Sequence, residues 1–201
     1  MEQLARRLMK GVKVMYYSWN ALVLFLYKQS FEGFTMGKHV CFNGLPTLRV
    51  FGKCSLGNSV TFNSATSYNG VGLFKNCSIF VMKNAVLTIG DHSGFSAVSI
   101  YCAHQITIGR YCKFGGNVCI WDTDFHSLNY MDRRSPTTDS TFAHSASITI
   151  GDDVFVGANS IILKGVTIGA RAIVGAGSVV AKNIPANQLW AGNPAKFIRK
   201  L

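Results

Sequence analysis

The chain has 201 residues, of which 48% are hydrophobic and 14% are charged, and it contains 20 glycines but only 4 prolines. This composition excludes a disordered chain and predicts one folded domain, alone or with a short appendage, that has many tight backbone corners. The net charge of +11 favours anionic partners such as an acidic polysaccharide, a lipid surface or a phosphate-rich cofactor. No helix-turn-helix, zinc-finger or RNP-like motif is recognised, which disfavours a protein that binds nucleic acid.

The longest apolar stretch near the N-terminus is Val14–Tyr27, which has four basic residues between positions 6 and 13 before it. Its length is short for a membrane-spanning helix, which needs about 20 residues. We expect residues 1–33 to form a helical segment, and two alternatives remain open for its contacts. A basic amphipathic helix could rest through residues 1–28 on a membrane surface, whereas we favour packing against its own domain or a neighbouring subunit.

The six cysteines form no CxxC pair, and no cleavable signal peptide is recognised. These features indicate reduced, buried thiols in a cytoplasmic protein, with peripheral contact to the inner membrane face as an alternative. Cys54 and Cys112 fall at positions of a repeating pattern, described below, that take small apolar residues, so we expect both thiols to be structural.

A six-residue repeat begins at Ile150 and reads IGDDVF, VGANSI, ILKGVT, IGARAI, VGAGSV, VAKNIP. An aliphatic residue leads each block, and Gly or Ala follows it in five of the six. A period of six belongs neither to a helix nor to a flat strand. It predicts coils with three short flat faces, aliphatic inward residues and small residues at the corners. Because each coil uses three blocks, residues 150–184 should make about two stacked coils.

The same period appears less regularly earlier in the chain, where three trios are recognised. They are Val50, Leu56 and Phe62; Ile89, Phe95 and Tyr101; and Ile108, Phe114 and Ile120. Residues 66–86 cannot be assigned a register from the pattern. The stacked array needs caps at its ends, for which the N-terminal segment and the tail after Pro185 are candidates.

The repeat stops after Ile120 and resumes only at Ile150, which leaves a loop over residues 121–147 that contains the segment WDTDFH. Structureless loops of this length inside a compact domain are usually functional. His126 falls where the next block would have begun, which places a titratable side chain at an aliphatic position of the pattern.

These blocks, followed by VVAKNIPANQLWAGNPAKFIRK, resemble the hexapeptide-repeat acyltransferases. The tail is similar to the closing motif of the maltose, galactoside and serine acetyltransferase branch, and DTDFH is similar to a segment of capsular polysaccharide O-acetyltransferases. The resemblance implies an all-β solenoid, a left-handed parallel β-helix over residues 34–184, with an N-terminal helical segment, a protruding loop and a short tail over residues 185–201. It also implies a homotrimer with sites between subunits.

Acetyl transfer from a thioester to an alcohol requires a base for the hydroxyl proton and a donor for the developing oxyanion, and no covalent enzyme intermediate. We expect His126 to be the base, with Asp124 or Asp122 orienting its ring, and His144 is the alternative base. The structural alternative is that the DTD residues of this segment cap a turn and that His126 is a solvated loop residue.

The predicted acceptor site comprises the loop residues Trp121, Asp122, Tyr130 and His144. The two aromatic rings could stack on a sugar, and packing of both rings on the coil is an equal alternative. Arg133 and Arg134 could contact an acidic acceptor, although we favour a solvated pair.

The resemblance implies acetyl-CoA as co-substrate, with its pantetheine arm in the groove between neighbouring coils. The matching positions are Phe155, Ala158, Ala176, Ala181, Lys182, Lys196 and Arg199, and Trp190 is predicted over the cofactor or the trimer seam. Small side chains would let the arm approach the backbone, and the three basic side chains could bind its phosphates. The alternative at each alanine is that the corner of the coil requires a small residue whether or not coenzyme A binds there. The chain departs from the family pattern at two of these positions. Phe155 stands where several relatives carry Trp, and Ala181 stands where a hydroxyl residue is common. The detailed contacts with the cofactor therefore stay open.

A zinc site like that of the hexapeptide-repeat carbonic anhydrases needs three converging histidines, and the five histidines here show no close pair, so no metal is expected. We expect an acetyl-CoA-dependent O-acetyltransferase that acts on a sugar hydroxyl of a cell-surface or capsular polysaccharide, which could be acidic. Two alternatives stay open. One is a small-molecule acetyltransferase acting on an amino acid, a free sugar or a nucleotide amino sugar, and the other is a non-catalytic scaffold.

Overall fold

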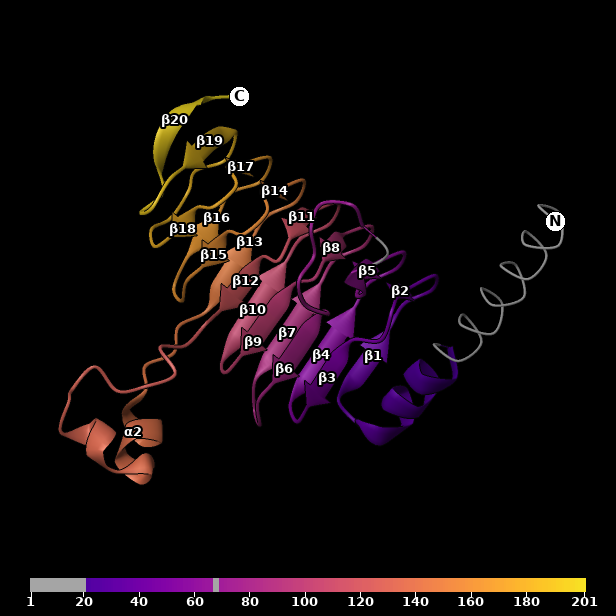
Figure 1. Cartoon of the computed structure of the whole chain (residues 1–201), viewed down its shortest axis with the longest axis horizontal. Coiled ribbons are helices and arrows are strands. Elements are labelled where there is room, and N and C mark those ends of the chain that lie inside the picture. The colour runs from indigo at the N-terminus through magenta and orange to yellow at the C-terminus, as the bar shows by residue number, and fades with distance from the viewer. Residues whose placement is uncertain (1–20, 67–68) are drawn as a thin grey trace, which may run out of the picture. The chain divides into compact units, whose positions relative to one another are not determined.

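The computed structural model describes residues 21–66 and 69–201 (Figure 1). The chain divides into two units, of which the first ends at Glu32 and contains a helix over residues 21–30. Most of the predicted basic and apolar N-terminal segment lies outside the described residues. No helix in the described parts of the chain is long and apolar enough to cross a membrane.

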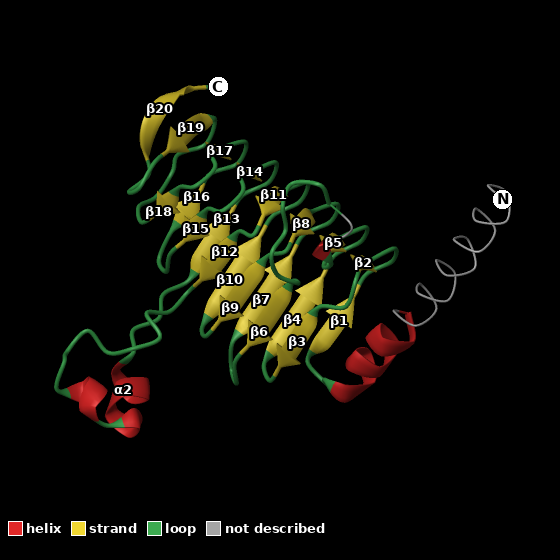
Figure 2. Cartoon of the chain, in the orientation of Figure 1, coloured by secondary structure: helices red, strands yellow, loops and turns green. Residues whose placement is uncertain are grey.

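The second unit, which starts at Gly33, contains three sheets of short strands, which are parallel except for the last strand of one sheet (Figure 2). Sheet A contains β1 (Phe34–Met36), β4 (Lys53–Leu56), β7 (Val86–Ile89), β10 (Gln105–Ile108), β13 (Ile148–Ile150) and β16 (Thr167–Ile168). Sheet B contains β2 (Cys41–Asn43), β5 (Thr61–Asn63), β8 (Gly94–Ser96), β11 (Lys113–Gly116), β14 (Phe155–Val156), β17 (Ile173–Val174), β19 (Gln188–Ala191) and β20 (Lys196–Lys200). Sheet C contains β3 (Thr47–Val50), β6 (Ser78–Val81), β9 (Ser99–Cys102), β12 (Cys119–Trp121), β15 (Ile161–Ile162) and β18 (Val179–Val180).

The chain visits the three sheets in the order A, B, C and repeats this circuit, so that each circuit forms one coil. From β13 onward the register is regular, since Ile150 pairs with Ile168 and Ile162 pairs with Val180. The six blocks from Ile150 therefore form two coils, as the six-residue period predicted. The leading aliphatic residues of these blocks are buried in the space enclosed by the sheets.

In the earlier coils most strands of sheets A and C have four residues and turn two side chains inward. Strand β9 shows the consequence, because Ile100 and Cys102 are both buried while Tyr101 lies on the outer surface. The prediction of Tyr101 as the inward member of its trio was therefore wrong by one residue. Ile100 holds that place, in register with Ile120. All six cysteines are free thiols, and Cys54, Cys77, Cys102 and Cys112 are buried, whereas Cys41 is exposed and Cys119 half-buried, so the prediction of buried thiols was wrong for Cys41.

A column of phenylalanine rings fills the interior behind sheet B. Phe42, Phe62, Phe95 and Phe114 stack in sequence, with ring centroids 4.6, 4.9 and 4.6 Å apart and the rings within 12° of parallel. Each ring belongs to a different coil, so the stack ties four coils together along the axis. Aromatic contacts of this kind add about 0.5–1.5 kcal/mol each to the stabilisation from burial.

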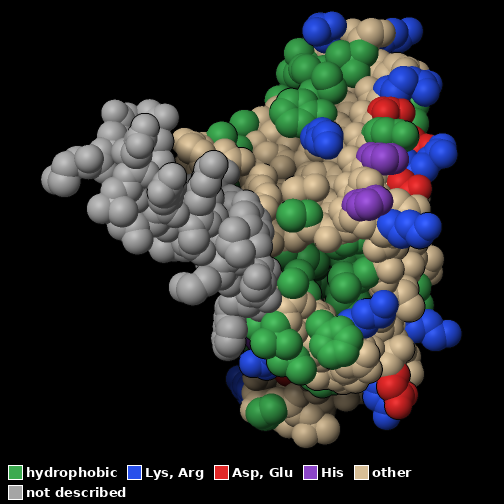
Figure 3. Space-filling view, turned by 90° about the vertical axis from the view of Figure 1, so that its right-hand side faces the viewer, with side chains coloured by type: hydrophobic (Ala, Val, Ile, Leu, Met, Phe, Trp, Pro, Cys, Tyr) green, Lys and Arg blue, Asp and Glu red, His purple; other side chains and the backbone are tan. Residues whose placement is uncertain are grey.

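The turns between sheets form three edges of the solenoid. The A–B edge includes residues 90–93, 109–112 and 151–154, the B–C edge includes residues 97–98, 157–160 and 175–178, and the C–A edge includes residues 103–104, 163–166 and 181–183. Close approach of coils requires small residues here, because a Cβ added at Gly157 would collide with the backbone of Ala176. Figure 3 shows charged and histidine side chains gathered along one border of the face drawn.

Two insertions interrupt the coils at their edges. Residues 64–77 separate β5 from β6, which explains why residues 66–86 show no register in the sequence. Residues 122–147 separate β12 from β13 and contain the short helices η2 (Asp132–Arg134) and α2 (Pro136–Phe142), which Figure 1 shows standing away from the sheets. Both insertions return the chain in step, since Ile108 pairs with Ile150 across the second one.

The tail after Pro185 extends sheet B beyond the last coil. Strand β19 pairs in parallel with β17, and β20 turns back to pair with β19 in the antiparallel sense. The tail thus covers the strand edge that the final coil would otherwise leave open on this sheet.

Candidate active site

The loop over residues 122–147 leaves the C–A edge through a narrow neck held by backbone hydrogen bonds. The N–H of Asp124 donates to the carbonyl of His144 at 3.0 Å, and the N–H of Ala146 donates to the carbonyl of Asp122 at 2.9 Å. Thr123 and Ser145 form an antiparallel bridge between the same two segments. The neck thus fixes the direction in which the loop leaves the coil.

Asp122 anchors this neck to the preceding coil. Its carboxylate accepts hydrogen bonds from the backbone N–H groups of Ala103 at 2.6 Å and His104 at 2.9 Å, and the residue is 0% exposed. A carboxylate that is buried and bonded to the backbone cannot reach a substrate. The prediction of Asp122 at the acceptor site is therefore corrected to a structural role.

His126 lies at the loop tip, where its ring is held by Asp139 of α2. The Nδ1 atom is 2.6 Å from Asp139 Oδ2, and the other carboxylate oxygen accepts the Ser127 N–H at 2.7 Å. The hydrogen bond with His126, followed by that from Ser127, holds the pKa of Asp139 below its usual range. Since an ionised carboxylate can only accept, Nδ1 of His126 is the donor in this pair.

Asp124 is not the residue that orients this ring, contrary to the sequence prediction. Its Oδ2 lies 3.4 Å from Lys164 Nζ, in an ion pair across the C–A edge. The same oxygen is buried and has no hydrogen-bond partner within the described parts of the chain. Asp124 and Lys164 line a pocket of about 220 Å³ together with Thr123, Leu163 and Ala181.

The remaining predicted loop residues divide between the coil and the loop tip. Trp121 is the last residue of β12 in sheet C, and the ring of Phe125, in the loop, packs edge-on against it with ring centroids 5.6 Å apart. Tyr130 is exposed at the tip, with the Arg134 guanidinium 5.5 Å from the centre of its ring. Arg133 donates to the carbonyl of Ser127 at 2.6 Å, which braces the segment after His126.

The predicted cofactor residues lie on two different parts of the solenoid. Most of them belong to sheet B or to the B–C edge, namely Phe155, Ala158, Ala176, Trp190, Lys196 and Arg199. Ala181 and Lys182 lie at the C–A edge, after β18. A single chain therefore does not bring all eight positions together.

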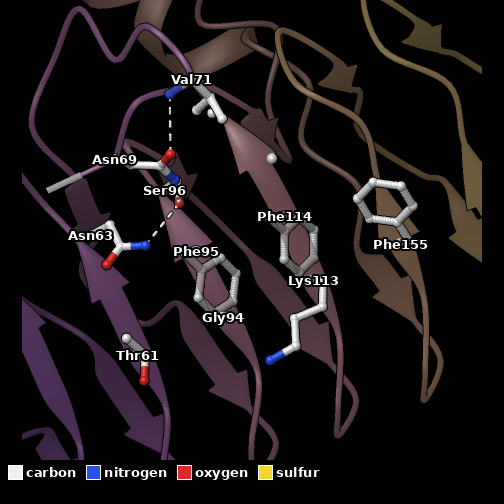
Figure 4. A pocket seen from close by; sticks show the side chains of 12 residues that line it. Thr61, Asn63, Asn69, Val71, Gly94, Phe95, Ser96, Lys113, Phe114 and Phe155 are labelled. Carbon is white, nitrogen blue, oxygen red and sulfur yellow. Dashed lines mark hydrogen bonds between the residues drawn. The ribbon is translucent and has the colours of Figure 1, made fainter. Parts of the chain in front are cut away.

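Sheet B carries a second pocket, of about 400 Å³, which we call the sheet-B pocket (Figure 4). It is lined by Thr61, Asn63, Asn69, Val71, Gly94, Phe95, Ser96, Lys113, Phe114, Gly115, Gly116 and Phe155. Its volume falls within the range of roughly 300–1,000 Å³ that is usual for small-molecule sites. Phe155 connects it to the predicted cofactor residues. Sequence reasoning missed the other lining residues, because a hollow formed by glycines and an insertion leaves no periodic signal.

Residues 147–182 match the family model described as bacterial transferase hexapeptide (six repeats). The chain is 33% identical over 155 residues to WbbJ of Escherichia coli K12, which is named for O-acetyl transfer in lipopolysaccharide biosynthesis, and the match covers 73% of this chain and 76% of WbbJ. It is 50% identical over 66 residues to gamma carbonic anhydrase 2 of Arabidopsis thaliana mitochondria, a match that covers only 30% of this chain and 24% of that protein. No group of three metal-ligating side chains occurs within residues 21–66 and 69–201.

The solved structure of a hexapeptide-repeat acetyltransferase from Vibrio cholerae aligns with 90% of this chain and 81% of its own, at a TM-score of 0.58 and 27% identity. The complex of that enzyme with acetyl-CoA aligns with 57% of this chain and 60% of its own, at a TM-score of 0.51 and 37% identity. The relatives and the strand order agree with the expectation from the sequence motifs. The chain therefore belongs to the hexapeptide-repeat transferase family and has its fold, a left-handed parallel β-helix.

Proposed function

We propose that the chain is an acetyl-CoA-dependent O-acetyltransferase that acts on a sugar hydroxyl, with His126 as the general base. The observation that carries this proposal is the pair formed by His126 and Asp139, because it leaves Nε2 as a proton acceptor on an exposed loop. The similarity to WbbJ supports a cell-surface polysaccharide as the source of the acceptor. We place the reaction on the cytoplasmic side, where acetyl-CoA is available.

In this mechanism Nε2 of His126 takes the proton of the acceptor hydroxyl while the oxygen of that hydroxyl attacks the acetyl carbonyl. Asp139 stabilises the positive charge that the ring then carries, because its carboxylate accepts from Nδ1 at 2.6 Å. The imidazolium returns the proton to the departing sulfur, so that the base is regenerated. Acetyl-CoA supplies the activated thioester. The small side chains of Ala158 and Ala176 and the charges of Lys182, Lys196 and Arg199 fit its pantetheine arm and phosphates.

Two features support a site shared between copies of the chain. The loop with His126 leaves the C–A edge, whereas the sheet-B pocket and most predicted cofactor residues lie on sheet B or its far edge. The loop also exposes large apolar side chains, including Leu128 at 79% and Phe142 at 59%, which a neighbouring subunit would cover. We therefore include a homotrimer in the proposal, in which His126 of one copy faces the sheet-B pocket of the next.

The test is thiol release from acetyl-CoA, measured with a panel of neutral and acidic glycans, free sugars and small alcohols. His126→Ala should lower turnover by at least about 10²-fold while the oligomeric state and the affinity for acetyl-CoA stay near normal. His144→Ala tests the alternative base, and His39→Ala is a matched control at a surface turn. Full activity in His126→Ala together with loss in His144→Ala would reject the assignment of the base.

The same panel separates the two competing functions. Activity only on a free amino acid or a nucleotide amino sugar would indicate a small-molecule acetyltransferase. No thiol release with any acceptor, combined with an unchanged assembly in the His126 variant, would indicate a scaffold.

A further inference from the structure

The sheet-B pocket exists because one strand position lacks a side chain. Thr61, Gly94, Lys113 and Phe155 follow one another across the outer surface of sheet B, in register. A Cβ placed on Gly94 would meet nothing closer than Lys113 Nζ at 3.4 Å, and its φ is not in the left-handed region. The backbone therefore does not require glycine at position 94. Because glycine has no side chain, an open hollow lies beside Lys113.

A strap formed by residues 69–74, part of the first insertion, closes the pocket toward the B–C edge. Asn117 fixes the strap by accepting from the Phe74 N–H at 3.3 Å and donating to the Gly72 carbonyl at 3.3 Å. Asn69 from the strap and Asn63 from β5 both donate to Ser96 Oγ at 3.1 Å. Because that oxygen receives two donors, its own proton is available for an oxygen of a bound molecule. The wall therefore offers polar groups at fixed positions (Figure 4).

Among the described residues that line this pocket, Lys113 alone carries a positive charge. Its Nζ donates to the backbone carbonyl of His92 at 3.3 Å and forms no ion pair with any carboxylate of the described residues. Asp152, in a turn of the A–B edge, is paired with Arg110 at 2.8 Å. An ammonium group that no described carboxylate neutralises, beside a mainly apolar pocket whose lining includes Asn63, Asn69 and Ser96, favours an anionic ligand.

We infer that the sheet-B pocket selects an acidic sugar, whose carboxylate pairs with Lys113 while its hydroxyls contact Ser96 and Asn69. This inference rests on the proposed O-acetyltransferase function and narrows its acceptor class to glycans that contain uronic or similar acids. A phosphate of coenzyme A is a second source of negative charge for Lys113, and the experiment separates the two.

Binding is measured first, without acetyl-CoA, by titrating the full chain with the methyl glycosides of glucose and galactose and of the corresponding uronic acids. The wild-type protein should bind each uronide about 5-fold more tightly than its neutral partner, as expected for a partly exposed ion pair, and salt should reduce the difference. Lys113→Met should abolish the preference. Lys53→Met, at the start of a strand of sheet A, should retain it. Gly94→Leu should weaken binding of all four glycosides by filling the hollow.

Kinetics with acetyl-CoA then separate the two anions. Lys113→Met should raise KM for acidic acceptors and leave KM for acetyl-CoA unchanged. The inference fails if the variant keeps the preference for uronides, if the wild-type protein binds neither class, or if only KM for acetyl-CoA rises. A wild-type protein that binds uronides selectively but releases no thiol would reject the proposed function and leave the binding specificity standing.

Discussion

Replacing Asp122 tests whether this residue supports the loop or binds the acceptor. Asp122→Ala removes the acceptor for two backbone N–H groups, at 2.6 and 2.9 Å, from a site that is 0% exposed. A hydrogen bond to a charged group contributes about 1.5–3 kcal/mol to stability. Because the N–H of exposed His104 can form a hydrogen bond with water instead, we expect the free energy of unfolding to fall by about 2–4 kcal/mol. Asp122→Asn keeps one acceptor oxygen and should lose about half as much.

The assay is urea unfolding followed by circular dichroism at one protein concentration, because the stability of an oligomer depends on concentration. The matched control is Asp124→Ala, which removes only an ion pair at 3.4 Å and should cost less than about 1 kcal/mol. If Asp122→Ala unfolds like the wild-type protein but loses affinity for the acceptor, the structural role is refuted and the original prediction of an acceptor contact is restored.

Three further outcomes are expected. Asp139→Asn should lower kcat by about 10²-fold or more with stability unchanged if His126 is the base, and because the pKa of Asp139 lies below its usual range, this carboxyl should stay ionised on mild acidification. Phe62→Ala should cost about 3–5 kcal/mol in urea unfolding, since the ring is buried between two others, whereas Phe51→Ala at an exposed turn should cost less than about 0.5 kcal/mol. Burial raises the pKa of Cys54 to about 12, so a thiol reagent at pH 8 should label exposed Cys41 and spare Cys54 until the protein unfolds.

The coil register was predictable where each strand turns a single residue inward. From Ile150 to Ile184 no residue is inserted, so a period of six describes every strand and corner. The earlier coils use longer strands with two inward residues, and a count of one apolar residue in six cannot choose between neighbours such as Ile100 and Tyr101. The first insertion removed the register entirely, because the pattern carries no information about how far a loop departs before the coil resumes.

The candidate site was predictable only in part, for a related reason. His126 was identifiable because it follows the break in the repeat and matches a family segment. Asp139 was not, since it lies 13 positions further along the chain, which folds back here through two short helices whose packing no local pattern specifies. The two aspartates nearest in sequence, Asp122 and Asp124, have other partners, which shows that proximity along the chain is a poor guide to contacts in a loop of this length.

The way in which the loop joins the coil separates the residues that stabilise the fold from those proposed to act in the reaction. Ile108 and Ile150 pair in register across the entire loop, so the hydrogen bonds of sheet A do not depend on what the loop contains. Helices η2 and α2 contribute no buried residue, and therefore substitutions at the tip have little core packing to disturb. Changes at His126 or Asp139 should consequently alter kinetics at constant stability, whereas changes at Asp122 should alter stability first and activity through the displaced neck. Because η2 and α2 bury no residue and sheet A pairs in register across the loop, side chains of these two helices can change at little cost to the fold.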